Sequence, residues 1–367
     1  MGSLAVLVTF LFCVSSAFAH ARIQAATAGE ASQAPPRSSA KTSGPSRDQD
    51  AASDPGLAQA KLLVEKGLLR QAEETTRQYL QQHADSAEGH FLLGYVLFDE
   101  IHDRYAAEEE KEGPSFRYND SVGASLASLR DQKARESLAE FSDGARYGPA
   151  SGFDLKIVAL DYLLLQNQPS AEKWLAASVK LNPQDAQAWF YLGRTAYSET
   201  KYANAIEAFE HCLKLDPKNV VAEYNVGLAF EGLNQRDQAI QAYQNAIAWQ
   251  EQSNIKSPEP FIDLARLHLE QNEPQKAVPY LTQAVRTFPQ ISLAHEELGR
   301  AYSVLKRLPE AQQELEQAVK LSPDKASLRC LMGQVYQREK MAAKAQTEFD
   351  RCATLQNAKS SGAAHLK

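Results

Sequence analysis

The sequence predicts an all-α protein, an α-solenoid of about eight stacked helix-turn-helix repeats. Three observations support this fold class. Residues 186–219 contain two helical patterns separated by a short polar turn. The same residue types return at a spacing of about 34 residues through most of the chain. Most units close on a proline, which cannot continue the helix before it.

Small residues recur where the two helices of each unit must cross. In the second helix the series is Ala171, Ala205, Ala239, Ala277, Ala311 and Ala345. In the first helix it is Gly193, Gly227, Ala265, Gly299 and Gly333. Antiparallel helices approach closely only where a side chain is absent or one carbon long. One pair cannot bury its apolar face alone, so we expect the pairs to stack into a continuous core.

This pattern resembles the tetratricopeptide repeat (TPR), whose motif reads W-x2-L-G, then A-x3-F, then P. In residues 186–219 the motif is carried by Trp189, Leu192, Gly193, Ala205, Phe209 and Pro217. The resemblance covers residues 53–359 and implies a right-handed superhelix with a concave groove. Phrases such as AWFYLGR and AIAWQEQS are similar to exported TPR proteins of bacteria. The fold class specifies no role by itself.

Residues 1–19 predict a signal peptide. An apolar run from Leu4 to Val14 is followed by small residues that end in an A-x-A pattern at Ala17–Ala19, although no Lys or Arg precedes the run. The run is short for a transmembrane span. We expect cleavage after Ala19, an exported protein that is periplasmic or secreted, and no stable membrane span afterwards. The alternative is an uncleaved segment that anchors the chain in the membrane.

The remaining chain divides into a linker, the solenoid and a tail. Residues 20–52 are rich in Ala, Ser and Pro and predict a disordered linker, because they cannot bury enough apolar surface to fold. The solenoid spans 53–359, with an insertion at about 101–131 inside its second repeat; Ser121–Arg130 within it is compatible with an extension of the following helix. Six regular repeats follow, and residues 360–367 form a flexible tail. The predicted repeats are 152–185, 186–219, 220–253, 258–291, 292–325 and 326–359.

Several function classes lack support in the sequence. The net charge of −7 provides no field that attracts nucleic acid. The chain has no glycine-rich phosphate loop, no G-x-S-x-G elbow and no H-E-x-x-H motif. We therefore expect no catalysis, no cofactor and no metal site.

The cysteines are interpreted as ordinary packing residues. Cys212 and Cys352 take a second-helix position that alanine fills in other repeats, so we expect both to be buried. Cys330 lies on a first helix and is expected to face the groove, where an exported thiol has the option of pairing with a partner. We expect no disulfide framework.

The candidate functional surface is the groove that the first helices line. At the fifth, ninth and twelfth places of successive repeats, the candidate partner-binding residues are Phe190, Arg194, Tyr197, Tyr224, Leu228, Arg266 and Arg300. Exposed aromatic side chains bury area against a partner, and arginines select carboxylate or phosphate groups. A clamp for a C-terminal carboxylate is not expected, because Leu160 stands where the resemblance to such TPR domains requires asparagine.

Internal packing is the alternative interpretation of these residues. Arg266 and Arg300 each have a glutamate one helical turn away, Glu270 and Glu296, with which they can pair along their own helix. Tyr197 and Tyr224 can pack between adjacent first helices. At the level of function, we expect a non-catalytic scaffold that binds an extended peptide or helix of a partner protein in the groove. The alternative is an envelope assembly or structural subunit that self-associates through the solenoid ends.

Overall fold

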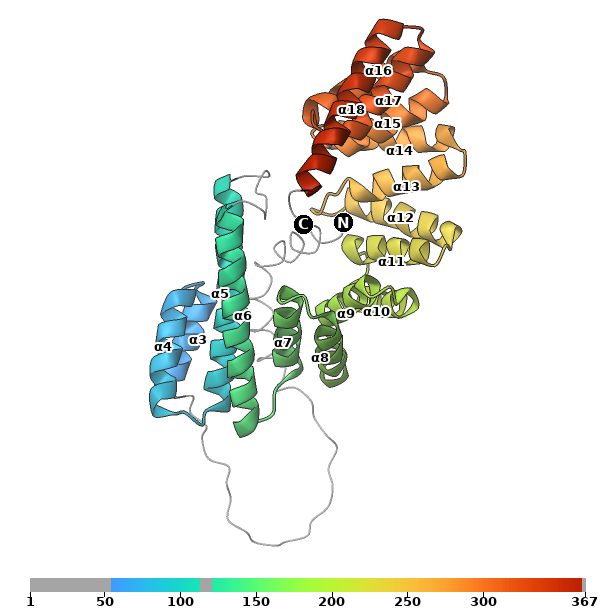
Figure 1. The fold of residues 1–367 in the computed structure, drawn as a ribbon. Coiled ribbons are helices and arrows are strands. Elements are labelled where there is room, and N and C mark those ends of the chain that lie inside the picture. Colours follow the sequence, from blue (N-terminus) through green and yellow to red (C-terminus); the bar gives the residue numbers. More distant parts are fainter. Residues whose placement is uncertain (1–53, 113–120, 365–367) are drawn as a thin grey trace, which may run out of the picture. The chain divides into compact units, whose positions relative to one another are not determined.

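The computed structural model describes residues 54–112 and 121–364, and in these ranges it contains sixteen α-helices, α3 to α18, and no strand. The chain divides into two compact units, Met1–Gln184 and Asp185–Lys367. Within each unit, consecutive helices pack as hairpins (Figure 1). The predicted all-α solenoid of helical hairpins is confirmed. The predicted signal peptide and linker lie outside the described residues.

The first unit contains three hairpins, one of which is much longer than a standard repeat. The pairs are α3 (Pro55–Glu65) with α4 (Leu69–Gln82), α5 (Ala87–Glu112) with α6 (Ser121–Tyr147), and α7 (Gly152–Leu164) with α8 (Gln168–Leu181). The insertion expected at 101–131 is helical wherever it is described, because α5 continues to Glu112 and α6 begins at Ser121. The expected extension of the second helix from Ser121 is therefore present, whereas the extension of α5 was not anticipated.

A buried polar contact joins three helices of the first unit. The Ser137 hydroxyl of α6 lies 2.8 Å from the Gly94 carbonyl oxygen of α5 and 2.6 Å from Asp161 Oδ2 of α7. Asp161 is fully buried, and burial raises the pKa of its carboxyl well above the usual range. Since one hydroxyl proton serves one acceptor, a protonated Asp161 would donate to the Ser137 hydroxyl oxygen, while Asp161 Oδ1 has no hydrogen-bond partner among the described residues.

The second unit contains five hairpins in which repeats follow one another regularly. The pairs are α9 (Ala186–Ser198) with α10 (Tyr202–Leu215), α11 (Val220–Gly232) with α12 (Arg236–Glu251), α13 (Glu259–Glu270) with α14 (Pro274–Thr287), α15 (Ser292–Val304) with α16 (Leu308–Leu321), and α17 (Ala326–Arg338) with α18 (Ala342–Ala364). The four extra residues 254–257 lie between α12 and α13. Helix α18 continues to Ala364, beyond the boundary at residue 359 that we expected for the last repeat.

The small residues lie where the helices cross, as predicted. Ala205, Ala239 and Ala311 have no exposed surface. At Gly227, an added Cβ would lie 2.4 Å from the ring of Tyr243 in the partner helix of the same hairpin. The glycine therefore gives the aromatic ring the space of a missing side chain, and the hairpin closes around it.

Every hairpin turn among the described residues contains a residue with left-handed backbone conformation. In these turns the positive φ values fall at one register position of the repeat, at Gly67, Gln166, Thr200, Asn234, Asn272, Lys306 and Lys340, and a further one, Lys218, lies between α10 and α11. In the first of the second unit's turns, Thr200 N donates to Tyr197 O and Lys201 N donates to Ala196 O, which satisfies carbonyls at the end of α9. Some helices begin at a side-chain cap; at the start of α11, Asn219 Oδ1 accepts from Ala222 N at 2.9 Å.

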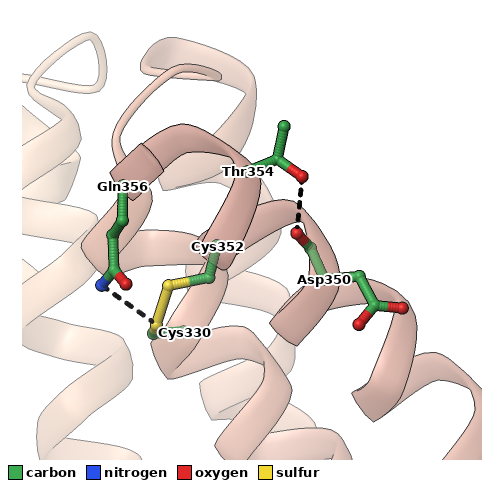
Figure 2. Close-up of a disulfide and its surroundings, with 5 residues drawn as sticks. All are labelled: Cys330, Asp350, Cys352, Thr354 and Gln356. Carbon is green, nitrogen blue, oxygen red and sulfur yellow. Dashed lines mark hydrogen bonds between the residues drawn. A yellow bond between two sulfur atoms is a disulfide. The ribbon is translucent and has the colours of Figure 1, made fainter. Parts of the chain in front are cut away.

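A disulfide joins Cys330 of α17 to Cys352 of α18, so our expectation of no disulfide framework is wrong for this pair. Figure 2 shows the two side chains meeting between the helices of one hairpin. Their Cα atoms are 5.4 Å apart, within the range that a disulfide spans. Cys352 is buried as expected, but as half of a crosslink, and Cys330 is not a free thiol. Cys212 is a buried free cysteine, as predicted.

Candidate functional site

The seven predicted partner-binding residues come from the first helices α9, α11, α13 and α15. We call the surface formed by these seven side chains the first-helix face. Phe190, Arg194, Tyr197, Tyr224, Leu228 and Arg266 are half-buried, and Arg300 is exposed. The structure brings five of them into two adjoining regions, which differ in how their charges are balanced.

The first region, the α9 segment, consists of Phe190, Arg194 and Tyr197. The Phe190 ring centroid lies 5.8 Å from that of Phe209, and the Arg194 guanidinium carbon lies 5.9 Å from the Phe190 centroid. The Tyr197 ring lies 5.5 Å from the ring of Tyr202 at the start of α10. The Phe190 ring is therefore the aromatic neighbour of the Arg194 guanidinium on a half-buried surface, at the outer range of a cation–π contact.

Burial shifts the pKa values of two side chains in the α9 segment, Arg194 and Tyr197. It lowers the pKa of Arg194 from its ordinary value, because a half-buried cation loses hydration. Burial also raises the pKa of Tyr197, and the nearby Tyr202, Glu231 and Asp263 raise it further. Tyr197 thus marks the border between the α9 segment and the acidic side chains of the next two repeats.

The second region, the acidic network, consists of Tyr224 and Glu231 of α11 with Asp263 and Arg266 of α13. The Tyr224 hydroxyl donates to Asp263 Oδ2 at 2.7 Å. One guanidinium nitrogen of Arg266 donates to Glu231 Oε1 at 2.9 Å and to Asp263 Oδ1 at 3.1 Å. The buried Tyr243 hydroxyl also donates to Glu231, at 3.0 Å. The network links the neighbouring first helices α11 and α13 to each other and to Tyr243 of the second helix α12.

The carboxylates of the acidic network determine its electrostatics. Burial raises the pKa of Asp263, while the hydrogen bond from Tyr224 and the charge of Arg266 oppose this increase. Burial alone would lower the pKa of Arg266, but the carboxylates of Asp263 and Glu231 raise it above its ordinary value. Since Glu270 also lies 3.6 Å from Arg266, three carboxylates share one guanidinium.

The alternative of internal pairing is therefore realised for two of the three predicted arginines. Arg266 pairs with Glu270 along its own helix and with Glu231 across to the preceding repeat. Arg300 lies 3.7 Å from Glu296 and 3.6 Å from Glu297. Of the three arginines expected to select acidic groups of a partner, Arg266 and Arg300 are paired with acidic neighbours, and Arg194 is not paired with any described acidic side chain.

The remaining predicted residues, Tyr224 and Leu228, also take part in packing. Tyr224 reaches the next first helix through Asp263, and its ring lies 5.6 Å from that of Tyr243. Leu228 packs against the core cluster that contains Phe261 and Ile262. Both keep part of their surface accessible, so packing and partner contact are compatible for these side chains.

The acids Glu231, Asp263 and Glu297 were missed as members of the site. Glu231 occupies the twelfth place of its repeat and Asp263 and Glu297 the sixth place of theirs, so the register already put them beside the predicted residues. Burial raises the pKa of Glu297, and its Oε2 has no hydrogen-bond partner among the described residues. In the described ranges, no group of three His, Cys, Asp or Glu side chains is placed to hold a metal ion.

Comparison with protein families agrees with this repeat geometry. Family models described as tetratricopeptide repeat match residues 57–111 and 262–326, residues 186–219 and residues 224–253. The chain is a tetratricopeptide repeat protein. The TPR matches occur in both compact units. Within the described residues, no helix of this TPR protein is long and apolar enough to span a bilayer.

Relatives with curated names match only short parts of the TPR chain. The peroxisomal targeting signal receptor of Saccharomyces cerevisiae is 41% identical over 54 residues, which are 15% of this chain and 9% of the receptor. Superkiller protein 3 of the same yeast is 19% identical over 121 residues, 33% of this chain and 8% of that protein. The match thus spans less than a tenth of either relative.

Solved structures show limited similarity as well. YrrB, described as a TPR protein with an unusual peptide-binding site, superposes with a TM-score of 0.43 at 19% identity and covers 50% of this chain and 92% of its own. PilW, described as a widely conserved type IV pilus biogenesis factor, gives a TM-score of 0.46 at 18% identity and covers 54% of this chain and 90% of its own. The family assignment rests on the repeat matches.

Proposed function

We propose that this TPR protein is a non-catalytic scaffold that binds an extended peptide or a helix of another protein on its first-helix face. The observation that carries the proposal is the α9 segment, where two aromatic side chains and an arginine remain accessible on a half-buried surface. Aromatic and arginine side chains supply most of the binding energy in protein interfaces. The name of the yeast relative that receives a targeting signal is consistent with this class of function.

The neighbouring repeats would extend this contact surface. Leu228 and Tyr224 of α11 continue the apolar character of the α9 segment, and both are already held by packing. Side chains that are fixed before binding lose little rotamer freedom when a partner arrives, so less of the interaction energy is lost to ordering. An elongated partner segment that crosses α9 and α11 would use both repeats.

Export of the protein is part of the proposal. Residues 1–19 carry the signal-like pattern, and the disulfide between Cys330 and Cys352 is a covalent bond that persists mainly in oxidising compartments. A fusion to a phosphatase reporter that is active only outside the cytoplasm tests this point. An inactive reporter, with free thiols at both cysteines in cell extracts, would contradict export.

Site-specific photocrosslinking tests the proposed binding surface. A photoreactive amino acid at Phe190 is expected to trap a discrete partner, whereas the same group at Arg286, an exposed residue of the second helix α14, is not. Tyr197→Ala should weaken the crosslink obtained at Phe190 without a large loss of thermal stability. Equal crosslinking from both positions, or unfolding of the Tyr197 variant, would contradict the proposal.

Sedimentation separates this function from self-association. A scaffold for a foreign segment is expected to sediment as one species over a wide concentration range. A crosslink from Phe190 that joins two copies of this chain, together with concentration-dependent sedimentation, would instead favour the structural subunit that assembles with itself.

A further inference from the structure

The three arginines of the first-helix face differ in whether a carboxylate neutralises them. Arg266 and Arg300 each lie within 4 Å of at least two acidic side chains. Arg194 forms no ion pair and no hydrogen bond with any of the residues that the structure describes. Its recorded contact is the ring of Phe190. Among the described residues, Arg194 is therefore a half-buried cation whose side chain has no anionic partner.

This state is unfavourable for the free protein and favourable for binding. A guanidinium stays charged at any physiological pH, so partial burial removes hydration that no acidic group replaces. An incoming anion gains the full attraction of this charge, while most of the cost of desolvating the arginine was already incurred during folding. The adjoining Phe190 ring restricts the side chain and so limits the entropy that binding would remove.

We propose that Arg194 is an anion subsite that binds the carboxylate of an Asp or Glu side chain in the partner segment. This inference rests on the proposed function, because it assigns a chemical preference to the same surface. Phe190 and Tyr197 cover the apolar neighbours of that acidic residue. Arg266 and Arg300 do not contribute to the preference, since their own acids already occupy them.

A carboxylate fits the subsite better than a phosphate. One guanidinium presents two parallel N–H groups, which match the two oxygens of a carboxylate. A phosphate dianion requires more compensating charge, and the cation whose charge reaches Tyr197, Arg266, is already paired with Glu231, Asp263 and Glu270. The neighbouring Glu231 and Asp263, whose charges reach Tyr197, would repel a dianion more strongly than a monoanion. The partner is therefore inferred to carry an ordinary acidic residue.

A selection from random peptides tests the subsite without knowledge of the natural partner. The full chain is immobilised and used to select from a phage library of random short peptides, in parallel with Arg194→Gln and with Arg286→Gln. Both variants lose one positive charge, but Arg286 is an exposed residue on the second helix α14. Circular dichroism melts verify that each variant is folded.

A selected peptide then measures the preference directly. We expect peptides selected by the wild type to be enriched in Asp or Glu at one position, and replacing that acid by its amide to weaken binding about tenfold, the value of a charged hydrogen bond. Arg194→Gln should bind the acid and amide peptides equally. Arg286→Gln should retain the difference.

The two possible failures are distinguishable. Peptides that bind the wild type but show no acidic enrichment, or an acid preference that survives Arg194→Gln, would overturn the anion subsite and leave the scaffold function standing. Selection of no peptide above background by any of the folded proteins would overturn the proposed function and the subsite together. An acid preference that is lost in Arg286→Gln would show a general charge effect and would also overturn the subsite.

Discussion

The α9 segment and the acidic network adjoin one another on the first-helix face, yet each holds its arginine in a different way. Arg266 occupies the same place in its repeat as Arg194 does, but it is surrounded by Glu231, Asp263 and Glu270. Arg194 has the Phe190 ring beside it, and none of the acidic side chains in the described part of the chain pairs with it. One position in the repeat therefore serves structure in one hairpin and is left available in another. The neighbours, and not the place in the motif, decide which.

Replacing the glycine that packs beneath each region by alanine should give the largest difference in stability between the acidic network and the α9 segment. In Gly227→Ala, the new Cβ would lie 2.4 Å from the ring of Tyr243, whose hydroxyl donates to Glu231. We expect a loss of about 3 kcal/mol in the free energy of unfolding. The displaced Tyr243 ring and the weakened hydrogen bond to Glu231 cause this loss, and the higher helix propensity of alanine reduces it. Urea denaturation followed by circular dichroism measures it.

Gly193→Ala is the matched variant for the α9 segment. Its Cβ would lie 2.7 Å from the Phe209 ring, which has no hydroxyl to lose. We expect a smaller loss of about 1–2 kcal/mol. If the two variants lost equal stability, the hydrogen bond that links Tyr243 to the acidic network would contribute nothing.

Replacing each arginine by methionine tests the charge balance itself. Arg266→Met leaves Glu231 and Asp263 facing each other without a cation, so we expect a loss of about 2 kcal/mol, reduced by the partial exposure of the site. Arg194→Met removes an uncompensated charge and keeps the apolar stem, and should not lower the thermal midpoint. A comparable loss in both variants would show that Arg194 has an acid partner in solution.

Removing single hydroxyl groups should give a smaller effect of the same kind. Tyr224→Phe deletes the donor to Asp263, and we expect a loss of about 1 kcal/mol. The Tyr197 hydroxyl makes no hydrogen bond to the described residues, so Tyr197→Phe should be close to neutral by the same denaturation assay. A neutral Tyr224→Phe would indicate that water replaces the hydroxyl at Asp263.

The pH dependence of stability should give the smallest effect. Burial raises the folded-state pKa of Glu297, while Arg300, Arg266 and Lys325 oppose this and Glu296 adds to it. A raised pKa means that folding binds a proton; the contribution is complete below about pH 4 and is lost as pH rises through the folded-state pKa. Glu297→Gln should therefore gain stability relative to the wild type at neutral pH, by no more than about 1 kcal/mol.

Glu310 serves as the control, because its pKa is shifted in the opposite direction from that of Glu297. Its hydrogen bond from Arg307 lowers the pKa of this exposed carboxyl. Its contribution is present above the ordinary carboxyl pKa and disappears as the pH falls, so Glu310→Gln should not gain at neutral pH. Thermal melts over the acidic and neutral range compare the two variants. A Glu297→Gln variant that is less stable at neutral pH than at pH 4, relative to the wild type, would contradict the sign.

The hairpins and their core could be predicted because the period repeats a local packing rule. Ala205 and Gly227 are small for the same reason in every repeat, and both are buried against a large side chain or helix. The turn residues could not be predicted from composition alone. Thr200 and Lys306 adopt a left-handed backbone that sequence rules assign to glycine or asparagine, because the fixed geometry of the hairpin determines the conformation there.

Charge pairing and crosslinking depend on distances that the motif does not specify. Glu231 and Arg266 are 35 positions apart and meet only because adjacent first helices stack with a defined offset. The same applies to Cys330, which was expected to face the groove and instead reaches Cys352 of α18. The sequence did place both cysteines in one repeat, which is compatible with a disulfide between them. Deciding whether Cys330 pairs with Cys352 or with a thiol of another protein requires the direction of each side chain, which the motif does not give.

The crosslink between Cys330 and Cys352 closes one hairpin upon itself and ties no hairpin to the next. Arrays of this kind fold from whichever hairpin forms first and then grow by adding neighbours. A hairpin whose two arms cannot separate is the natural seed for that growth once the bond exists. Oxidation would thereby give the array a preferred starting point for folding, without a covalent bond between one hairpin and the next.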